Sequence, residues 1–104
     1  MLIVTTDSIA DRKIVKVLGL VKGSTVRSKN IGKDIGAGLK GIVGGELNAY
    51  TEMLTESRQI AIGRMVEEAE SMGANAIVAL RLQSAAVIQG AAEMVAYCTA
   101  VVIE

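Results

Sequence analysis

The sequence of 104 residues lacks histidine, proline, tryptophan and phenylalanine, and it contains a single cysteine, Cys98. Imidazole is the usual general base near neutral pH and the commonest metal ligand in proteins. Its absence excludes catalytic pairs of the Ser-His and Cys-His types. One cysteine excludes an intrachain disulfide framework and is typical of a reducing compartment. We therefore expect a cytoplasmic protein that is not an enzyme.

Charge of either sign is not in excess, because 11 Lys and Arg residues balance 11 Asp and Glu residues. A dedicated nucleic-acid binder needs a basic excess to neutralise phosphates, and two tyrosines offer little surface for base stacking. No apolar run approaches the roughly 18 residues of a membrane span. The first eight residues lack the pattern of a secretory signal. The sequence therefore predicts neither a nucleic-acid partner nor a membrane partner.

Apolar residues, by contrast, are abundant, at 51% of the chain, and charged residues make up only 21%. A charged share of about 25% is usual for soluble domains. A chain of this length forms one domain, which we take to span 1–104. Its apolar excess needs a cover, and contact with other copies of the chain would supply one.

The pattern along the chain predicts an α+β subunit with the element order ββααββ. Strands are expected at 2–6, 13–27, 76–83 and 94–103, with Gly19 and Gly23 as bulge or bend sites. A short helix is expected from Asn30 to the Gly44-Gly45 pair, and a long one at 46–72 with Gly73 just past its end. The expected fold is an antiparallel sheet packed on one short and one long helix.

The strands at 13–27 and 94–103 have no plainly polar face. A sheet with its helices on one side would normally leave the other side polar. We therefore expect the second face, or the edge, of this sheet to be buried against neighbouring subunits.

Glycine is dense between Gly32 and Gly45 and invites comparison with phosphate-binding loops. The nucleotide loop requires a Gly-Lys-Ser/Thr ending, which occurs nowhere in the chain. Glycines four residues apart on a helix allow close backbone approach, so packing explains the stretch better. An anion site remains the alternative.

Cys98 is the only strong ligand for a soft metal ion. One chain cannot build a four-ligand structural site from it, although a ring of subunits could bring several copies together. The alternative is a small buried apolar side chain in a strand. Arg58 interrupts the apolar stripe of the long helix, and we consider both an extended surface side chain and an ion pair with Asp34.

Several motifs in order resemble the YbjQ-like family, a bacterial and archaeal family labelled heavy-metal-binding. They are Asn30-x-x-x-Asp34-x-x-Ala37, Ile42-Val43-Gly44-Gly45, Tyr50-x-x-x-Leu54-x-x-x-Arg58-x-x-Ala61, and Ala69 followed by Gly73-Ala74-Asn75-Ala76. The resemblance implies a dodecin-like subunit assembled into a homopentameric ring. It marks six residues as structural or as the lining of a pocket between subunits: Asn30, Asp34, Gly44, Gly45, Tyr50 and Arg58.

Three functions follow from these observations. The first is a cytoplasmic homo-oligomer, expected to be a pentamer, with a binding or structural role. The second is heavy-metal-ion binding at a subunit interface or on the ring axis through Cys98 or carboxylates. A metal ion is therefore the one cofactor that we consider. The third is an enzyme whose site lies between subunits and uses Asp34, Tyr50 and Arg58.

Overall fold

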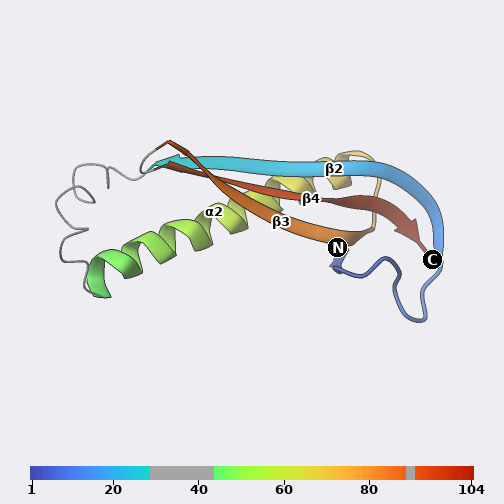
Figure 1. Cartoon of the computed structure of the whole chain (residues 1–104). Coiled ribbons are helices and arrows are strands. Elements are labelled where there is room, and N and C mark those ends of the chain that lie inside the picture. Colours follow the sequence, from blue (N-terminus) through green and yellow to red (C-terminus); the bar gives the residue numbers. More distant parts are fainter. Residues whose placement is uncertain (29–43, 89–90) are drawn as a thin grey trace.

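The computed structural model describes residues 1–28, 44–88 and 91–104. Strand β1 (Leu2–Ile3) and strand β2 (Ile14–Ser28) precede the long helix α2 (Gly44–Ser71). Strands β3 (Ala76–Ile88) and β4 (Ala91–Ile103) follow it. Figure 1 shows the three long strands running together, with α2 along the sheet. The α+β class and the long helix are confirmed, whereas the expected short helix at 30–44 lies outside the described residues.

The sheet has the strand order β1-β3-β4-β2 and is mixed rather than wholly antiparallel. β4 pairs antiparallel with both β2 and β3, but Leu2 and Ile3 pair parallel with Ala76 and Ile77. The expectation of a purely antiparallel sheet is therefore wrong at β1. The reason is the connection: the chain leaving β1 does not turn back as a hairpin but crosses to β2 at the opposite edge.

The main core lies between α2 and the sheet face beneath it. Ala61, Met65 and Ala69 recur along α2 at helical spacing and are fully buried, as the apolar stripe predicts. Met72, three residues after Ala69, is 40% exposed because the helix has already ended at Ser71. The strand residues of this core are Val21, Ile77, Met94, Ala96, Cys98 and Ala100.

Helix α2 ends in a Schellman motif around Gly73. The N–H of Ala74 donates to Ala69 O (3.1 Å), and the N–H of Gly73 donates to Glu70 O (3.0 Å). Gly73 adopts φ +87°, the left-handed conformation expected of a residue just past a helix end. The predicted helix stop is confirmed.

Gly19 and Gly23 play different roles in β2. The pairing with β4 shifts register between Val17 and Gly19, and Gly19 has φ +122°, so the predicted bulge is confirmed there. At Gly23 the ladder continues evenly opposite Ala96. A Cβ at Gly23 would overlap the backbone of α2 at Ala61 and Met65. Gly23 is therefore a close-approach site, and the bend expected there is wrong.

A second cluster lies on the opposite face of the sheet, at one end. Ala76, Val78, Val101 and Ile103 are buried there beneath Val4, Ile9 and Ile14. The segment that covers them, 4–13, is held by backbone bonds: Ala79 N–H to Thr6 O (2.8 Å), Leu80 N–H to Val4 O (3.2 Å) and Glu104 N–H to Lys13 O (3.0 Å). This segment covers only that end of the face.

The molecule is elongated, with extents of 54 × 22 × 16 Å and a radius of gyration of 17.2 Å. A compact domain of this length has a radius of gyration of about 13 Å. The length follows from the elements, because a 28-residue helix spans about 42 Å. Helix α2 therefore covers one face of the sheet and leaves much of the other face exposed.

Candidate functional site

The sheet face opposite α2, beyond the segment 4–13, carries exposed apolar side chains. Register places Leu20 opposite Thr99 and Val26 opposite Glu93 on this face, whereas the buried Val21, Gly23 and Thr25 between them face α2. Leu20 is 69% exposed, Val17 64%, Val26 60% and Tyr97 37%. We call the following set the outer patch: Val17, Leu20, Val26, Val95 and Tyr97.

A row formed by Lys22, Tyr97 and Arg81 crosses the sheet through the outer patch, between Leu20 and Val26. Tyr97 pairs with Lys22 on one side and with Arg81 on the other. The Arg81 guanidinium is already engaged, since its Nη1 donates to Thr5 O (2.9 Å) and to Leu80 O (2.9 Å). Arg81 therefore helps to hold the N-terminal segment at the border of the patch.

Two sheet edges lie beside the outer patch. β2 pairs with β4 on one side, and no strand of the described chain pairs with its other side. β1 pairs with β3 only at Ala76 and Ile77, so the edge of β3 from Arg81 onward has no strand neighbour among the described residues. Unpaired edges and an apolar face are the features through which sheets contact other chains.

Four of the six residues proposed for a pocket between subunits lie in the described structure, all of them in α2. Asn30 and Asp34 lie outside the described residues, as does the expected ion pair between Asp34 and Arg58. Gly44 and Gly45 open α2, which thus begins two residues earlier than predicted, and Tyr50 follows in the same helix. Arg58 is exposed on α2, where its Nη2 donates to Thr55 Oγ1 (3.3 Å), so it does not interrupt the buried stripe.

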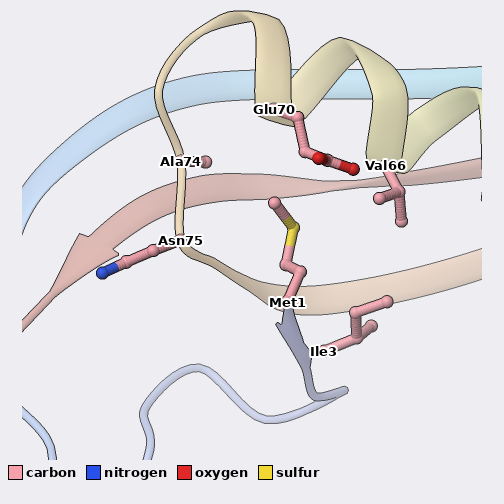
Figure 2. A pocket seen from close by; sticks show the side chains of 6 residues that line it. All are labelled: Met1, Ile3, Val66, Glu70, Ala74 and Asn75. Carbon is pink, nitrogen blue, oxygen red and sulfur yellow. The ribbon is translucent and has the colours of Figure 1, made fainter.

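A separate pocket of about 390 Å³ lies between β1, the last turns of α2 and the connection to β3. Figure 2 shows the side chains of Met1 and Glu70 pointing toward each other across it. Asn75, which also lines it, is held by Ile103: its amide donates to Ile103 O (2.8 Å) and accepts from Ile103 N–H (2.7 Å). Glu70 is the single charged side chain of the lining, so the pocket has little means of orienting a ligand.

The comparisons with known proteins decide the family. The YbjQ family model, described as "Putative heavy-metal-binding", matches residues 1–104. The chain belongs to the YbjQ-like family.

Relatives in this family come from both bacteria and archaea. A UPF0145 protein of Clostridioides difficile (strain 630) is 69% identical over 104 residues, covering 100% of this chain and 93% of the relative. One from Thermosipho africanus is 54% identical over 104 residues, covering 100% and 96%. One from Methanosarcina acetivorans is 54% identical over 101 residues, covering 97% and 95%. The resemblance inferred from the motifs is confirmed.

A solved structure shares the fold. It is the crystal structure of a protein of unknown function of the DUF74 family from Pediococcus pentosaceus. The match has a TM-score of 0.68 at 15% identity and covers 100% of this chain and 98% of that one. At this identity the likeness concerns the fold alone. Among the described residues, no helix is long and apolar enough to span a membrane.

The heavy-metal description of the YbjQ-like family can be compared with the donors present. Cys98 is 2% exposed and lies in the core beneath α2, on the sheet face away from the outer patch. Burial, with a smaller contribution from the negative charge of Glu68, raises the pKa of the Cys98 thiol to about 11. Metal ions bind the thiolate, so a thiol held protonated is a poor ligand.

Carboxylates do not supply the missing ligands within one subunit. In residues 1–28, 44–88 and 91–104, no group of three or more Cys, Asp or Glu side chains is placed to hold a metal ion. The described side chains therefore do not fit a metal centre formed by a single chain. Any such centre would need at least one donor from outside these described side chains.

The pattern along the chain did not predict the contacts made by Lys22, Arg81, Arg64 and Glu68. Lys22 is one of several polar residues of β2, among them Lys16 and Ser24, so the strand pattern did not single it out. Arg64 and Glu68 have the pattern of exposed helix residues, and their partners lie 40 and 46 positions away on β2. Such contacts depend on where α2 crosses the sheet, which spacing along the chain does not reveal.

Proposed function

We propose that this chain is a non-catalytic binding or structural subunit that assembles with copies of itself into a closed homo-oligomer, a pentameric ring. The observation that carries the proposal is the outer patch. Leu20, Val17 and Val26 are all at least 60% exposed on the part of the sheet face that the segment 4–13 leaves uncovered. Several large apolar side chains exposed on one face are typical of subunit interfaces.

The size of the exposed surface supports the same conclusion. The chain exposes 6493 Å². A compact monomer of 10.8 kDa exposes about 5500 Å² by the usual scaling with mass. An elongated subunit with surplus surface is stabilised when copies cover that surface.

The balance of charge favours identical copies as the occupants of the outer patch. A formal net charge of zero gives no long-range repulsion between copies. A near-neutral chain with exposed apolar side chains would aggregate unless the contact closed on itself. A ring closes the contact, and we place this assembly in the cytoplasm.

Analytical ultracentrifugation of the wild-type chain and of two variants tests the proposal. We expect a wild-type mass that is a multiple of 10.8 kDa, five-fold for the ring. Leu20→Glu places a charge in the outer patch and should release smaller species. Met72→Glu introduces the same charge at a side chain that is 40% exposed but lies outside the patch, and should leave the mass unchanged. A folded wild-type species of 10.8 kDa would refute the proposal.

Heavy-metal-ion binding at a subunit interface or on the ring axis is the second candidate, supported by the family description. Native mass spectrometry with a panel of divalent and thiophilic ions tests it on the wild type and on Cys98→Ala. Because Cys98 is buried and protonated, we expect any stoichiometric adduct to survive Cys98→Ala. An adduct lost in that variant would assign Cys98 as a ligand, contrary to the burial argument.

A further inference from the structure

The free edge of β2 is the longest unpaired strand edge in the described part of the molecule. β2 has 15 residues and contacts β4 on one side only. Its exposed side chains include Val15, Val17, Leu20 and Val26. A long apolar edge strand is a template on which another chain can add a strand, and folded proteins that persist in solution block such edges.

Two side chains of α2 reach this edge and bind its backbone. Arg64 Nη1 donates to Ser24 O at 2.6 Å, and Glu68 Oε2 accepts from Lys22 N–H at 3.2 Å. Backbone groups of residues two apart in a strand point the same way, so Lys22 N–H and Ser24 O both face outward from the sheet. These are the groups that an added strand would use.

The placement of Arg64 and Glu68 follows from the crossing at Gly23. The Cβ of Arg64 and the backbone of α2 lie so close to Gly23 that no side chain fits there. Arg64 therefore stands directly over the edge of β2, and Glu68 stands one turn further along the same helix face. Arg64 supplies a donor for the carbonyl of Ser24, and Glu68 supplies an acceptor for the N–H of Lys22.

We propose that Arg64 and Glu68 occupy the middle of the β2 edge in place of a neighbouring strand and so prevent a second copy from adding a strand there. A strand from another chain would have to displace two charge-assisted hydrogen bonds, which are stronger than neutral ones. The pair thereby confines contact between copies to other surfaces. This inference goes beyond the proposed ring and does not require it.

Three paired variants test the inference. Arg64→Ala with Glu68→Ala removes both groups without changing the net charge. Arg64→Glu with Glu68→Arg keeps the composition and the charge pair of the helix but offers each backbone group the wrong partner. Arg64→Lys with Glu68→Gln keeps a donor and an acceptor and serves as the matched control. Far-UV circular dichroism selects a temperature at which all are folded.

Two measurements are made on each variant. We expect the alanine and exchanged pairs to shift, in ultracentrifugation, to species larger than the wild-type assembly, with the infrared signature of intermolecular β-sheet. The Lys22 amide should exchange its hydrogen faster in both. The control pair should keep the wild-type size distribution.

Unchanged size distributions and unchanged Lys22 exchange in both the alanine and exchanged pairs would overturn the inference. If one of these pairs does not fold at any temperature, the other decides, because the exchanged pair retains the helix-forming side chains. The result is separable from the proposed ring. A monomeric wild type would refute the ring, whereas the edge inference is judged only by the change from wild type to variant.

Discussion

Single residues of this chain act mainly through burial and backbone geometry. Cys98 is chemically the most distinctive side chain, yet the core encloses it and its pKa is raised to about 11. A buried thiol of this kind is inert toward alkylating reagents at neutral pH, because the thiolate is the nucleophile. Cys98 therefore serves packing beneath α2.

The Cys98 thiol predicts a specific dependence of stability on pH. Its folded-state pKa of about 11 lies above the model value of 9.0, so the folded state retains the proton where the unfolded state releases it. The contribution to the free energy of unfolding is complete below pH 9.0 and is lost as the pH rises toward about 11. Urea unfolding across this range should show a steeper decline for the wild type than for Cys98→Ala. Parallel declines would show that the thiol ionises equally in both states.

The helix stop at Gly73 predicts opposite effects of two glycine substitutions. Gly73→Ala meets no steric obstacle, but φ +87° should cost about 1 kcal/mol of stability. Gly63→Ala, also unobstructed but inside α2, should stabilise the protein by about 0.5–1 kcal/mol. Chemical denaturation of both variants compares the two changes. A stabilising Gly73→Ala would contradict the Schellman geometry.

At the scale of elements, the contact of α2 with β2 organises the subunit. The backbone of the helix lies against the strand at Gly23. The small side chains of Ala96 and Ala100 in β4 allow the helix to lie close to the neighbouring strand as well. This approach places the side chains of Arg64 and Glu68 at the sheet edge. The packing of the core and the hydrogen bonds at the edge of β2 therefore both depend on where α2 crosses β2.

Gly23→Ala should be among the most damaging single substitutions in the described chain. The added methyl would overlap the backbone at Ala61 and Met65, which cannot move away as a flexible side chain could. We expect a loss of at least the upper part of the usual range of about 1–3 kcal/mol for overpacking. Thermal unfolding measures it, with Ser24→Ala as a neighbouring control. Near-equal melting temperatures for the two variants would show that α2 lies further from β2.

The N-terminal segment 4–13 is a second unit whose attachment can be tested. Arg81 joins Thr5 O to the bulge of β3, where Ala79 adopts φ +55° and bonds Thr6. Arg81→Ala should speed hydrogen exchange at Ala79 and Leu80, whose amides bond this segment, without affecting the amides beneath α2. Uniformly faster exchange would instead indicate global destabilisation.

For the whole molecule, the proposed assembly makes stability depend on concentration. The outer patch remains exposed in a lone subunit, so association would stabilise the folded chain by mass action. The melting temperature of the wild type should therefore fall on dilution. Leu20→Glu should weaken this dependence, whereas Met72→Glu should retain it. A melting temperature independent of concentration for the wild type would argue against the assembly.

Much of the fold was predictable because it depends on local patterns. The buried spacing of Ala61, Met65 and Ala69 follows from helical periodicity, and Gly73 follows from the backbone demands of a helix end. The bulge at Gly19 was predictable for a similar reason. The parallel pairing of β1 was not, since two residues carry too little pattern to choose a partner or a direction.

The sequence predicted that the sheet would expose an apolar surface, but not which residues would form it. Apolar residues on both faces of β2 and β4 indicated that the sheet would need a cover, and Leu20, Val17 and Val26 are indeed exposed. That Cys98 faces α2 rather than the outer patch depends on the register between strands, which periodicity alone leaves open.

The sequence by itself determined the element types, the helix stop, the family and the excess of apolar surface, because each depends on neighbours along the chain or on composition. Only the tertiary structure decided which sheet face α2 covers, that Gly23 is a contact rather than a bend, and that Arg64 and Glu68 meet the edge of β2. These features join residues about 40 positions apart. Such pairs are selected by packing of the whole subunit, which local spacing does not specify.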